Sequence, residues 1–375
     1  MIKRYLAEQI QKDLEKKMVF LGGPRQVGKT TLAQSLGPLE SYLNWDDSED
    51  RERILRKELP KTKLWIFDEI HKYKQWRNYL KGLYDKNKVT KNILVTGSAR
   101  LDLYRRGGDS LQGRYHFLRL HPLSLDELHS QKQSDLAALF DLGGFPEPFF
   151  SSSEIDSKRW SREYRQRVLQ EDILSVERID DIGLAELLMM RLPDLVGSPL
   201  SINSLREDLQ VSHKTVTRLL EIFERFYAIF RLGAFGSPKI KSVKKEMKHY
   251  HYDWTLLKDS SAKFENLIAC HLLKWCQFYE DSQGRDIQLC FFRDKEQREV
   301  DFVVVEDKKP ICFIEAKLSD KKISSSLYYL KKKFPMVPAF QLLYETTHDF
   351  QSDIGVRVAP AHAALSEIKL IIAGI

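Results

Sequence analysis

The sequence of 375 residues predicts an α/β protein that contains three domains. Short apolar runs alternate with helical patterns up to about residue 136, which is typical of a sheet covered by helices. The expected strands of this section are Met18–Leu21, Ser41–Trp45, Leu64–Phe67, Ile93–Thr96 and Tyr115–Leu120. A mostly helical section follows, and strand patterns return in the last third of the chain, at Ile287–Arg293, Val300–Val305 and Ile311–Glu315. We therefore expect an α/β domain over residues 1–136, a helical domain over residues 137–252, and a second α/β domain over residues 253–375.

The composition excludes several classes of protein. Hydrophobic residues make up 42% of the chain, which is enough to build cores and argues against wholesale disorder. No apolar run reaches 18 residues, so we expect no membrane span, and the first residues become charged too early for a signal peptide. No two cysteines form a C-x-x-C pair, so we expect free thiols in a reducing cytoplasm. The cysteines are Cys270, Cys276, Cys290 and Cys312.

The net charge of +7 is unevenly distributed along the chain. Residues 1–136 carry a net +8, residues 137–235 a net −4, and residues 236–375 a net +3. Five lysines and one glutamate lie between Lys239 and Lys248. This run is interpreted either as a local patch that contacts phosphates or as a solvated loop.

A phosphate-binding motif lies near the N-terminus. The stretch from Gly23 to Thr30 matches G-x-x-x-x-G-K-[ST], with an apolar strand at Met18–Leu21 before it and a helical pattern after it. The glycines let backbone N–H groups curl round phosphates, and the start of the helix adds partial positive charge. Lys29 is expected to reach the β- and γ-phosphates, and Thr30 to bind Mg²⁺. The expected ATP-binding residues are Gly23, Pro24, Arg25, Gln26, Val27, Gly28, Lys29, Thr30 and Thr31.

Two further strands supply candidates for hydrolysis of a nucleotide. The apolar run Leu64–Phe67 is followed by Asp68 and Glu69, and the ends of parallel strands are where ligands bind in such sheets. We expect Asp68 to hold the magnesium ion and Glu69 to act as a general base toward water. The run Ile93–Thr96 leads to Ser98, and either Thr96 or Ser98 is a candidate for holding that water. An ordinary strand end is the alternative interpretation.

Positive charge for the transition state would come from an arginine after the third of these strands. The candidates are Arg100, Arg105, Arg106 and Arg114. Arg114, in the sequence Gly113-Arg114 before an apolar strand, is our choice, acting either in its own chain or in a neighbouring subunit. Each of these arginines taken singly also fits an ordinary surface position.

These motifs together resemble the compact AAA-type P-loop ATPases of archaea and bacteria. The resemblance covers roughly residues 1–130, although His71 stands where that family usually has glutamine after the Asp-Glu pair. It implies a P-loop NTPase fold, binding of ATP and Mg²⁺, hydrolysis of ATP to ADP and phosphate, and a possible homo-oligomer. The matching motifs are Gly23–Thr31, Asn44–Asp47, Asp68–His71, Thr96–Ser98, Gly113-Arg114 and Pro122–Ser124.

The stretch Ser201–Phe223 has the pattern of a helix-turn-helix. Ser212 is a natural N-cap, and apolar residues from Val216 to Phe223 repeat at helical spacing. Strands at Phe226–Phe230 and Lys248–Tyr252 would complete a winged helix, with double- or single-stranded DNA as its partner. The alternative is a packing module without DNA contact. The outward residues expected on the recognition helix are His213, Lys214, Thr215, Thr217 and Arg218.

The last third of the chain contains the pattern D…E-x-K, formed by Asp301, Glu315 and Lys317. Carboxylates on adjacent strands bind hard cations, and a metal with a nearby lysine can activate water against a phosphodiester. Glu265, on the helix Phe264–Trp275, would complete the site. The pattern resembles the restriction-endonuclease-like fold, over roughly residues 236–375. We expect Glu265, Asp301 and Glu315 to bind Mg²⁺ or Mn²⁺, and Lys317 to be catalytic.

Two functions from different classes follow from these patterns. The first is an ATPase that acts on DNA through the winged helix and a metal-dependent nuclease. The second is an ATP-switched binding or regulatory protein whose nuclease fold is inert. A kinase is less well supported, because the pair Asp68-Glu69 favours water as the acceptor and the sequence contains no acceptor-binding motif.

Overall fold

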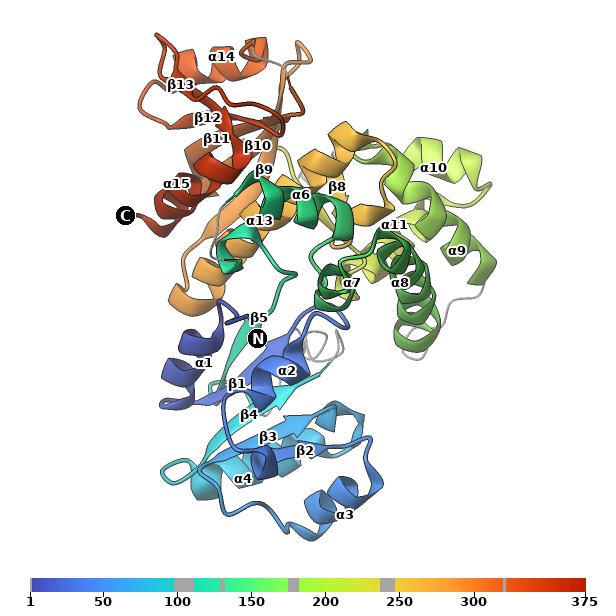
Figure 1. Ribbon diagram of the computed structural model, residues 1–375. Helices are drawn as coiled ribbons and strands as arrows, with labels where there is room; N and C mark the ends of the chain where they lie inside the picture. Colours follow the sequence, from blue (N-terminus) through green and yellow to red (C-terminus); the bar gives the residue numbers. More distant parts are fainter. Residues whose placement is uncertain (1, 98–110, 129–131, 175–181, 237–246, 320–321) are drawn as a thin grey trace. The chain divides into compact units, whose positions relative to one another are not determined.

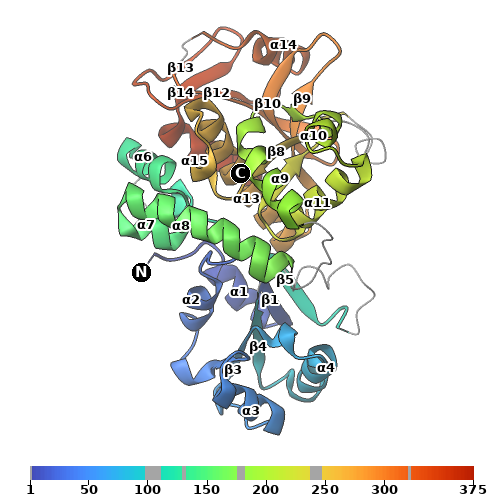
Figure 2. The same ribbon diagram turned by 90° about the vertical axis from the view of Figure 1, so that its right-hand side faces the viewer.

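The computed structural model describes residues 2–97, 111–128, 132–174, 182–236, 247–319 and 322–375 (Figures 1 and 2). The chain forms two compact units. Unit 1 comprises residues 1–123 with 225–227, and unit 2 comprises residues 124–224 and 228–375. The middle and C-terminal sections both lie in unit 2, and the three expected domains stay a prediction.

Unit 1 is built on a five-stranded parallel sheet with the strand order β2-β3-β4-β1-β5. All five strands expected from the sequence are present, each within one residue of the expected ends. Among the described residues, four α-helices accompany them along the chain. The strands are β1 (Met18–Gly22), β2 (Tyr42–Asn44), β3 (Leu64–Asp68), β4 (Asn92–Thr96) and β5 (Tyr115–Arg119), and the helices are α1 (Ala7–Leu14), α2 (Lys29–Gln34), α3 (Ser48–Arg56) and α4 (Trp76–Asn87).

The core of unit 1 explains why its strands are almost continuously apolar. Every residue of β1 and of β3 is buried, because helices cover both faces of a parallel sheet. Side chains two residues apart share a face, so Phe20, Phe67 and Val95 pack together with Ile54 of α3 and Trp76 of α4. This packing leaves the polar residues that follow the strands at one edge of the sheet.

Unit 2 begins with helices and a small antiparallel sheet. The sheet has the order β6-β8-β7, and two helices lie between β6 and β7 in the sequence. The elements are α6 (Gln133–Leu142), α7 (Pro146–Ser151), α8 (Glu154–Arg167), α9 (Ile182–Arg191), β6 (Pro199–Leu200), α10 (Ile202–Asp208), α11 (His213–Arg225), β7 (Ile229–Leu232) and β8 (Met247–His251).

The C-terminal part of unit 2 is a six-stranded mixed sheet with the order β13-β14-β12-β11-β10-β9. Strand β10 pairs antiparallel with both β9 and β11. Strand β12 pairs parallel with both β11 and β14. Helix α14 packs on one face through Leu327 and Leu330, and α13 and α15 lie together on the other (Figure 1). The elements are α13 (Ser260–Gln283), β9 (Ile287–Arg293), β10 (Glu299–Glu306), β11 (Lys309–Lys317), α14 (Ser325–Lys333), β12 (Ala339–Leu343), β13 (Phe350–Gln351), β14 (Val356–Pro360) and α15 (Ala361–Ala373).

The sequence analysis named β9, β10, β11 and the middle of α13, but it did not name the elements after β11. Within the part of the chain that the structure describes, no helix combines the length and the apolar character needed to cross a membrane. All four cysteines are free thiols, three of them buried and Cys290 half-buried.

Buried charges fix the first residues of unit 2 onto its C-terminal helices. The ammonium of Lys274 on α13 is buried against the carboxylate of Glu127 and the hydroxyl of Ser124. Lys369 of α15 pairs with Asp126 at 2.7 Å. Burial alone would raise the pKa of Asp126, but Lys274 and Lys369 lower it well below its usual range. The segment Ser124–Glu127 is therefore held by ionic contacts from two helices.

We expect Lys274→Met to lower the free energy of unfolding by about 3–5 kcal/mol, because it leaves Glu127 buried without its counter-ion. The measurement is denaturant unfolding followed by circular dichroism. Lys158→Met is the matched control, since Lys158 pairs with Glu154 on the surface and is 76% exposed. Its expected cost is below about 1 kcal/mol. Equal costs for the two variants would contradict a structural role for Lys274.

Candidate nucleotide site and C-terminal ion cluster

The loop between β1 and α2 has the backbone shape that its glycines predict. Gly23 has φ +135°, and a Cβ at this position would lie 2.3 Å from the carbonyl oxygen of Leu120, so only glycine fits. Gly28 has φ 96° and directly precedes α2. Lys29 is buried, and its Nζ donates to the carbonyl oxygens of Gly23 at 3.0 Å and Pro24 at 2.6 Å. The ammonium thus lies within the curve of the loop, as expected for a phosphate-binding lysine.

Arg4 supports this loop, although the sequence analysis did not select it. Its buried guanidinium donates to the carbonyl oxygen of Val27 at 2.7 Å and to that of His121 at 2.5 Å. Tyr5 adds a hydrogen bond from its hydroxyl to the carbonyl oxygen of Arg119 at 2.5 Å. The N-terminal segment therefore joins the phosphate-binding loop to the chain that follows β5.

Asp68 is held at the end of β3 by three hydroxyl groups. Its Oδ2 accepts from Thr30 at 2.8 Å and from Tyr42 at 2.7 Å, and its Oδ1 accepts from Thr96 at 2.6 Å. Burial and the charge of Asp68 raise the pKa of Tyr42 well above its usual range, so Tyr42 remains a donor. Thr30 and Asp68 are brought together as the sequence predicts. Hydroxyl and carboxylate oxygens are the ligands that Mg²⁺ prefers, so these residues fit that ion.

Glu69 lies next to Asp68 in an unusual backbone conformation. Its φ is 56°, and its backbone N–H donates to the carbonyl oxygen of Thr96 at 3.0 Å. The carboxylate lies 3.2 Å from Nζ of Lys72, which also contacts Asp46 at 2.5 Å. Burial raises the pKa of Glu69, and the charge of Lys72 opposes this rise. A non-glycine residue held at positive φ is a form of strain that is common at functional sites.

The structure places Arg114 away from the phosphate-binding loop of its own chain. Arg114 directly precedes β5, whereas the loop follows β1, and the two strands are parallel with Met18 opposite Tyr115. The five residues of β1 span roughly 16 Å, and this distance separates the edge of the sheet at Arg114 from the edge at the loop. The Arg114 guanidinium pairs with both carboxylate oxygens of Asp85, at 2.8 and 3.2 Å. A role in its own chain is therefore not supported, and a role toward a neighbouring subunit stays a prediction.

The other candidates after β4 lie outside the described residues. Ser98, which was expected to hold the attacking water, lies outside the described residues. The same holds for Arg100, Arg105 and Arg106. Thr96, the alternative to Ser98, is buried and donates to Asp68, so its hydroxyl positions the expected magnesium ligand.

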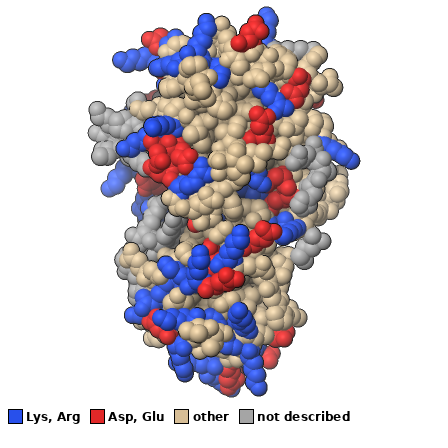
Figure 3. Space-filling view, turned by 90° about the vertical axis from the view of Figure 1, so that its left-hand side faces the viewer, with Lys and Arg blue, Asp and Glu red and all other residues tan. Residues whose placement is uncertain are grey.

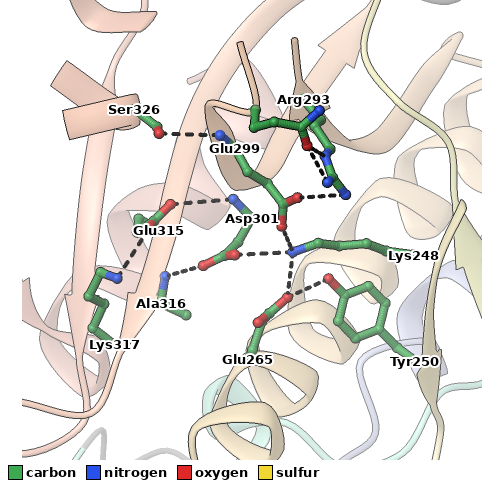
Figure 4. Close-up of polar contacts among 11 residues, drawn as sticks. Lys248, Tyr250, Glu265, Arg293, Glu299, Asp301, Glu315, Ala316, Lys317 and Ser326 are labelled. Atoms are coloured by element: carbon green, nitrogen blue, oxygen red, sulfur yellow. Dashed lines mark hydrogen bonds and ion pairs between the residues drawn. The ribbon is translucent and has the colours of Figure 1, made fainter. Parts of the chain in front are cut away.

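A second cluster of charged residues lies in unit 2, around Lys248 (Figure 4). The Lys248 side chain is 0% exposed, and its Nζ contacts Glu265 at 3.0 Å, Glu299 at 2.8 Å and Asp301 at 3.2 Å. Burial alone would lower the pKa of Lys248, but the carboxylates, Asp301 foremost, raise it above its ordinary value. Lys248 is therefore an ammonium ion enclosed by carboxylates from α13 and β10.

The alternation of side chains along the strands creates this cluster. Lys248 and Tyr250 lie two residues apart on β8 and share a face, and the Tyr250 hydroxyl donates to Glu265 at 2.7 Å. Glu299 and Asp301 are likewise two residues apart on β10. Lys248, at the end of the lysine run, was expected to belong either to a patch that contacts phosphates or to a solvated loop, and because its side chain is buried neither interpretation holds for this residue. Residues 239–246 of that run lie outside the described residues.

Glu315 and Lys317 lie beside this cluster on β11. The backbone N–H of Asp301 donates to Glu315 at 3.4 Å, and Asp301 accepts from the backbone N–H of Ala316 at 3.0 Å. Lys317 lies 3.5 Å from Glu315. Burial, followed by the charge of Asp301, raises the pKa of Glu315 to about 8. The structure thus gathers all four residues of the expected nuclease pattern at one place.

This arrangement nevertheless does not fit a metal ion at Glu265, Asp301 and Glu315. Lys248 stands between Glu265 and Asp301 and contacts both. Among the residues that the structure describes, no group of three or more His, Cys, Asp or Glu side chains is arranged to hold a metal. The chain thus supplies its own cation at this position, which the D…E-x-K pattern does not predict.

Three family models match successive parts of the chain. Residues 15–129 match an AAA domain, and residues 133–265 and 260–364 match two domains of unknown function. Together with the phosphate-binding loop and the parallel sheet, the first match defines unit 1 as an AAA-type P-loop ATPase domain, a class that binds and hydrolyses ATP.

Two relatives illustrate how far the similarity extends. An uncharacterised protein of Methanocaldococcus jannaschii is 24% identical over 359 residues, covering 84% of this chain and 79% of that protein. An uncharacterised protein of Mycobacterium tuberculosis is 27% identical over 246 residues, covering 64% of this chain and 55% of that protein. The match to the mycobacterial protein thus spans only about half of that protein's length.

Two solved structures show weak overall similarity. The Aeropyrum pernix ORC1 protein in complex with DNA is 15% identical, with a TM-score of 0.30, over 70% of this chain and 90% of that one. A Pyrococcus horikoshii signal-transduction ATPase with numerous domains is 14% identical, with a TM-score of 0.25, over 76% of this chain and 48% of that one.

We expect Lys72→Met to move the acid limb of the ATPase pH profile to higher pH. Lys72 lowers the pKa of Glu69, so its removal leaves burial and Asp68 to raise that pKa further. A smaller fraction of the expected base is then ionised at a given pH. The measurement is kcat between about pH 5 and about pH 8.5, which brackets the acid limb. Lys74→Met, at an exposed lysine two residues away, is the control and should leave the profile unchanged. An unshifted limb in Lys72→Met would argue against Glu69 as the base.

Proposed function

We propose that the chain is a Mg²⁺-dependent ATPase whose nucleotide state controls a DNA contact made by unit 2. One observation carries the ATPase part. Lys29, Thr30, Asp68 and Glu69 gather at the edge where β1 and β3 end, within the stretch that matches an AAA domain. This edge is where open α/β sheets bind ligands.

Each residue has a role that its position supports. The backbone N–H groups of the loop and the Lys29 ammonium bind the phosphates of ATP. Thr30 and Asp68 would hold Mg²⁺, which would supply positive charge next to the phosphates. Glu69 accepts the proton of the attacking water, and its raised pKa makes it a stronger base than an exposed carboxylate.

We expect Glu69→Gln to bind ATP normally but to hydrolyse it about 10²–10⁴ times more slowly, because only the proton acceptor is lost. Lys29→Ala should lose both binding and hydrolysis. Phosphate release and the binding of a fluorescent ATP analogue separate the two effects. Glu58→Gln, at an exposed glutamate, is the control. Normal hydrolysis by Glu69→Gln would exclude Glu69 as the base.

The order of elements in unit 2 supports the winged-helix interpretation. Helices α10 and α11 lie between β6 and β7, and β8 completes the antiparallel sheet. On α11, Val216, Leu220 and Phe223 are buried, whereas Lys214 and Arg218 are exposed. Exposed basic residues on the second helix of such a motif are typical of contact with the major groove. We therefore propose α11 as the DNA-contacting helix.

Charges of both signs mix on one face of the molecule. Figure 3 shows one face of the molecule, on which Lys and Arg side chains are interspersed with Asp and Glu rather than gathered into one continuous patch. Mixed charge of this kind favours solubility over a specific phosphate contact.

We expect Lys214→Ala/Arg218→Ala to weaken DNA binding and to reduce the slope of log K against log salt by about 2, because two phosphate contacts are lost. Fluorescence anisotropy with double- and single-stranded DNA, in ADP and in a non-hydrolysable ATP analogue, measures both quantities. The control is Lys158→Ala/Arg162→Ala, which removes two exposed cations from α8. The same salt slope in both double variants would argue against α11.

A metal-dependent nuclease is the second candidate function. It is favoured by the place of Asp301 and Glu315 on neighbouring strands, with Lys317 3.5 Å from Glu315. Its test is cutting of plasmid or single-stranded DNA with Mg²⁺ or Mn²⁺, which Asp301→Ala must abolish. Lys248 among the same carboxylates is the reason why we place this function second.

A further inference from the structure

We propose that Lys248 is a built-in cation that occupies the position of a divalent metal ion at Glu265, Glu299 and Asp301. Unit 2 would then bind neither Mg²⁺ nor Mn²⁺ at these carboxylates in its native form. The proposal concerns unit 2 alone and does not depend on ATP hydrolysis or DNA binding by the chain.

The contacts of Lys248 are those of a cation at the centre of a site. One ammonium touches one oxygen from each of three carboxylates, at 2.8–3.2 Å. These oxygens belong to two different elements, α13 and β10, while the lysine belongs to a third, β8. Three donors, the number that an ammonium group has, thus meet three acceptors. The side chain is completely buried, so it is fixed within the protein interior.

Each carboxylate also has a second partner that is not a metal. Tyr250 donates to Glu265, and the backbone N–H of Ala316 donates to Asp301. Arg293 lies 3.7 Å from Glu299 (Figure 4). The carboxylate oxygens are therefore already positioned and partly neutralised by groups of the chain. A metal ion would have to displace these contacts as well as the lysine.

A divalent ion and Lys248 cannot share this position. Mg²⁺ requires its oxygen ligands at about 2.0–2.1 Å, inside the distances that the ammonium occupies. Such an ion would lie in contact with a positive charge in a buried environment, where repulsion is weakly screened. Removal of the ammonium would instead leave three carboxylates that repel one another, and a divalent cation would relieve this repulsion once their oxygens move inward from the spacing that the ammonium sets.

The test is Mn²⁺ binding to the nucleotide-free full chain, measured by electron paramagnetic resonance. All proteins carry Asp68→Asn, which silences the expected magnesium site of unit 1. With Lys248 present, we expect no Mn²⁺ ion that depends on Asp301. Lys248→Ala should gain one Mn²⁺ ion per chain, and adding Asp301→Asn should remove it. Lys158→Ala, which frees the surface carboxylate of Glu154, is the matched control and should gain none.

Two results would overturn the proposal. The first is a Mn²⁺ ion bound while Lys248 is present and lost in Asp301→Asn. The second is a folded Lys248→Ala protein that gains no ion. Circular dichroism checks folding, and folding of Lys248→Ala only in the presence of Mn²⁺ would support the proposal. If Lys248→Ala folds neither with nor without Mn²⁺, the proposal is tested in the protein that retains Lys248. Loss of a bound Mn²⁺ ion in Asp301→Asn would then overturn the proposal, and unchanged Mn²⁺ binding would support it.

Discussion

The buried ammonium of Lys248 is the interaction on which the arrangement of unit 2 most depends. An isolated charge in a protein interior is very costly, so the carboxylates and the lysine can be buried only together. Glu265, Glu299 and Asp301 come from one helix and one strand, and Lys248 comes from a strand of a different sheet. A slip of one residue in β8 would turn Lys248 to the opposite face and leave the carboxylates unpaired. The cluster therefore fixes the register of β8 against α13 and β10.

In the nucleotide site, too, a buried carboxylate has polar partners, but these are hydroxyl groups rather than a lysine. Asp68 has a negative charge at the end of a buried strand, and hydroxyls of Thr30, Tyr42 and Thr96 satisfy it. Hydroxyl groups orient a carboxylate without neutralising it, so its charge stays available to a metal ion. In unit 2 three carboxylates share one lysine, which neutralises part of their charge. The carboxylate of Asp68 in unit 1 is thus oriented to bind a metal ion, whereas the carboxylate of Asp301 in unit 2 already contacts the ammonium of Lys248.

The sequence predicted unit 1 well because its signals are local. Strands of a covered parallel sheet are continuous apolar runs, and the loop from Gly23 to Thr30 is a contiguous motif with one physical purpose. Arg4 and Tyr42 were missed because their partners lie far along the chain. Arg4 contacts Val27 and His121, and no spacing rule connects a single arginine with two backbone carbonyl groups.

Unit 2 was predicted only in part, for a related reason. Asp301, Glu315 and Lys317 lie close together, as the sequence pattern predicts. The metal-binding role predicted for them did not take account of Lys248, which contacts Asp301. A lysine at the end of a lysine-rich run is normally solvated, and only the β8 alternation, with Lys248 and Tyr250 on one face, indicated otherwise. The strands β12 and β14 were not predicted, although both are mostly apolar, because short apolar runs do not distinguish strands from buried helices.

The position of Lys248 in the chain has a consequence for work with isolated fragments. The sequence suggests a domain border between residues 252 and 253, which separates Lys248 from the three carboxylates that surround it. A fragment beginning there would lack its internal counter-ion and would recruit cations from the buffer. If such a fragment cleaved nucleic acid, the activity would come from a metal site created by the truncation. Nuclease assays should therefore use the chain with Lys248 present.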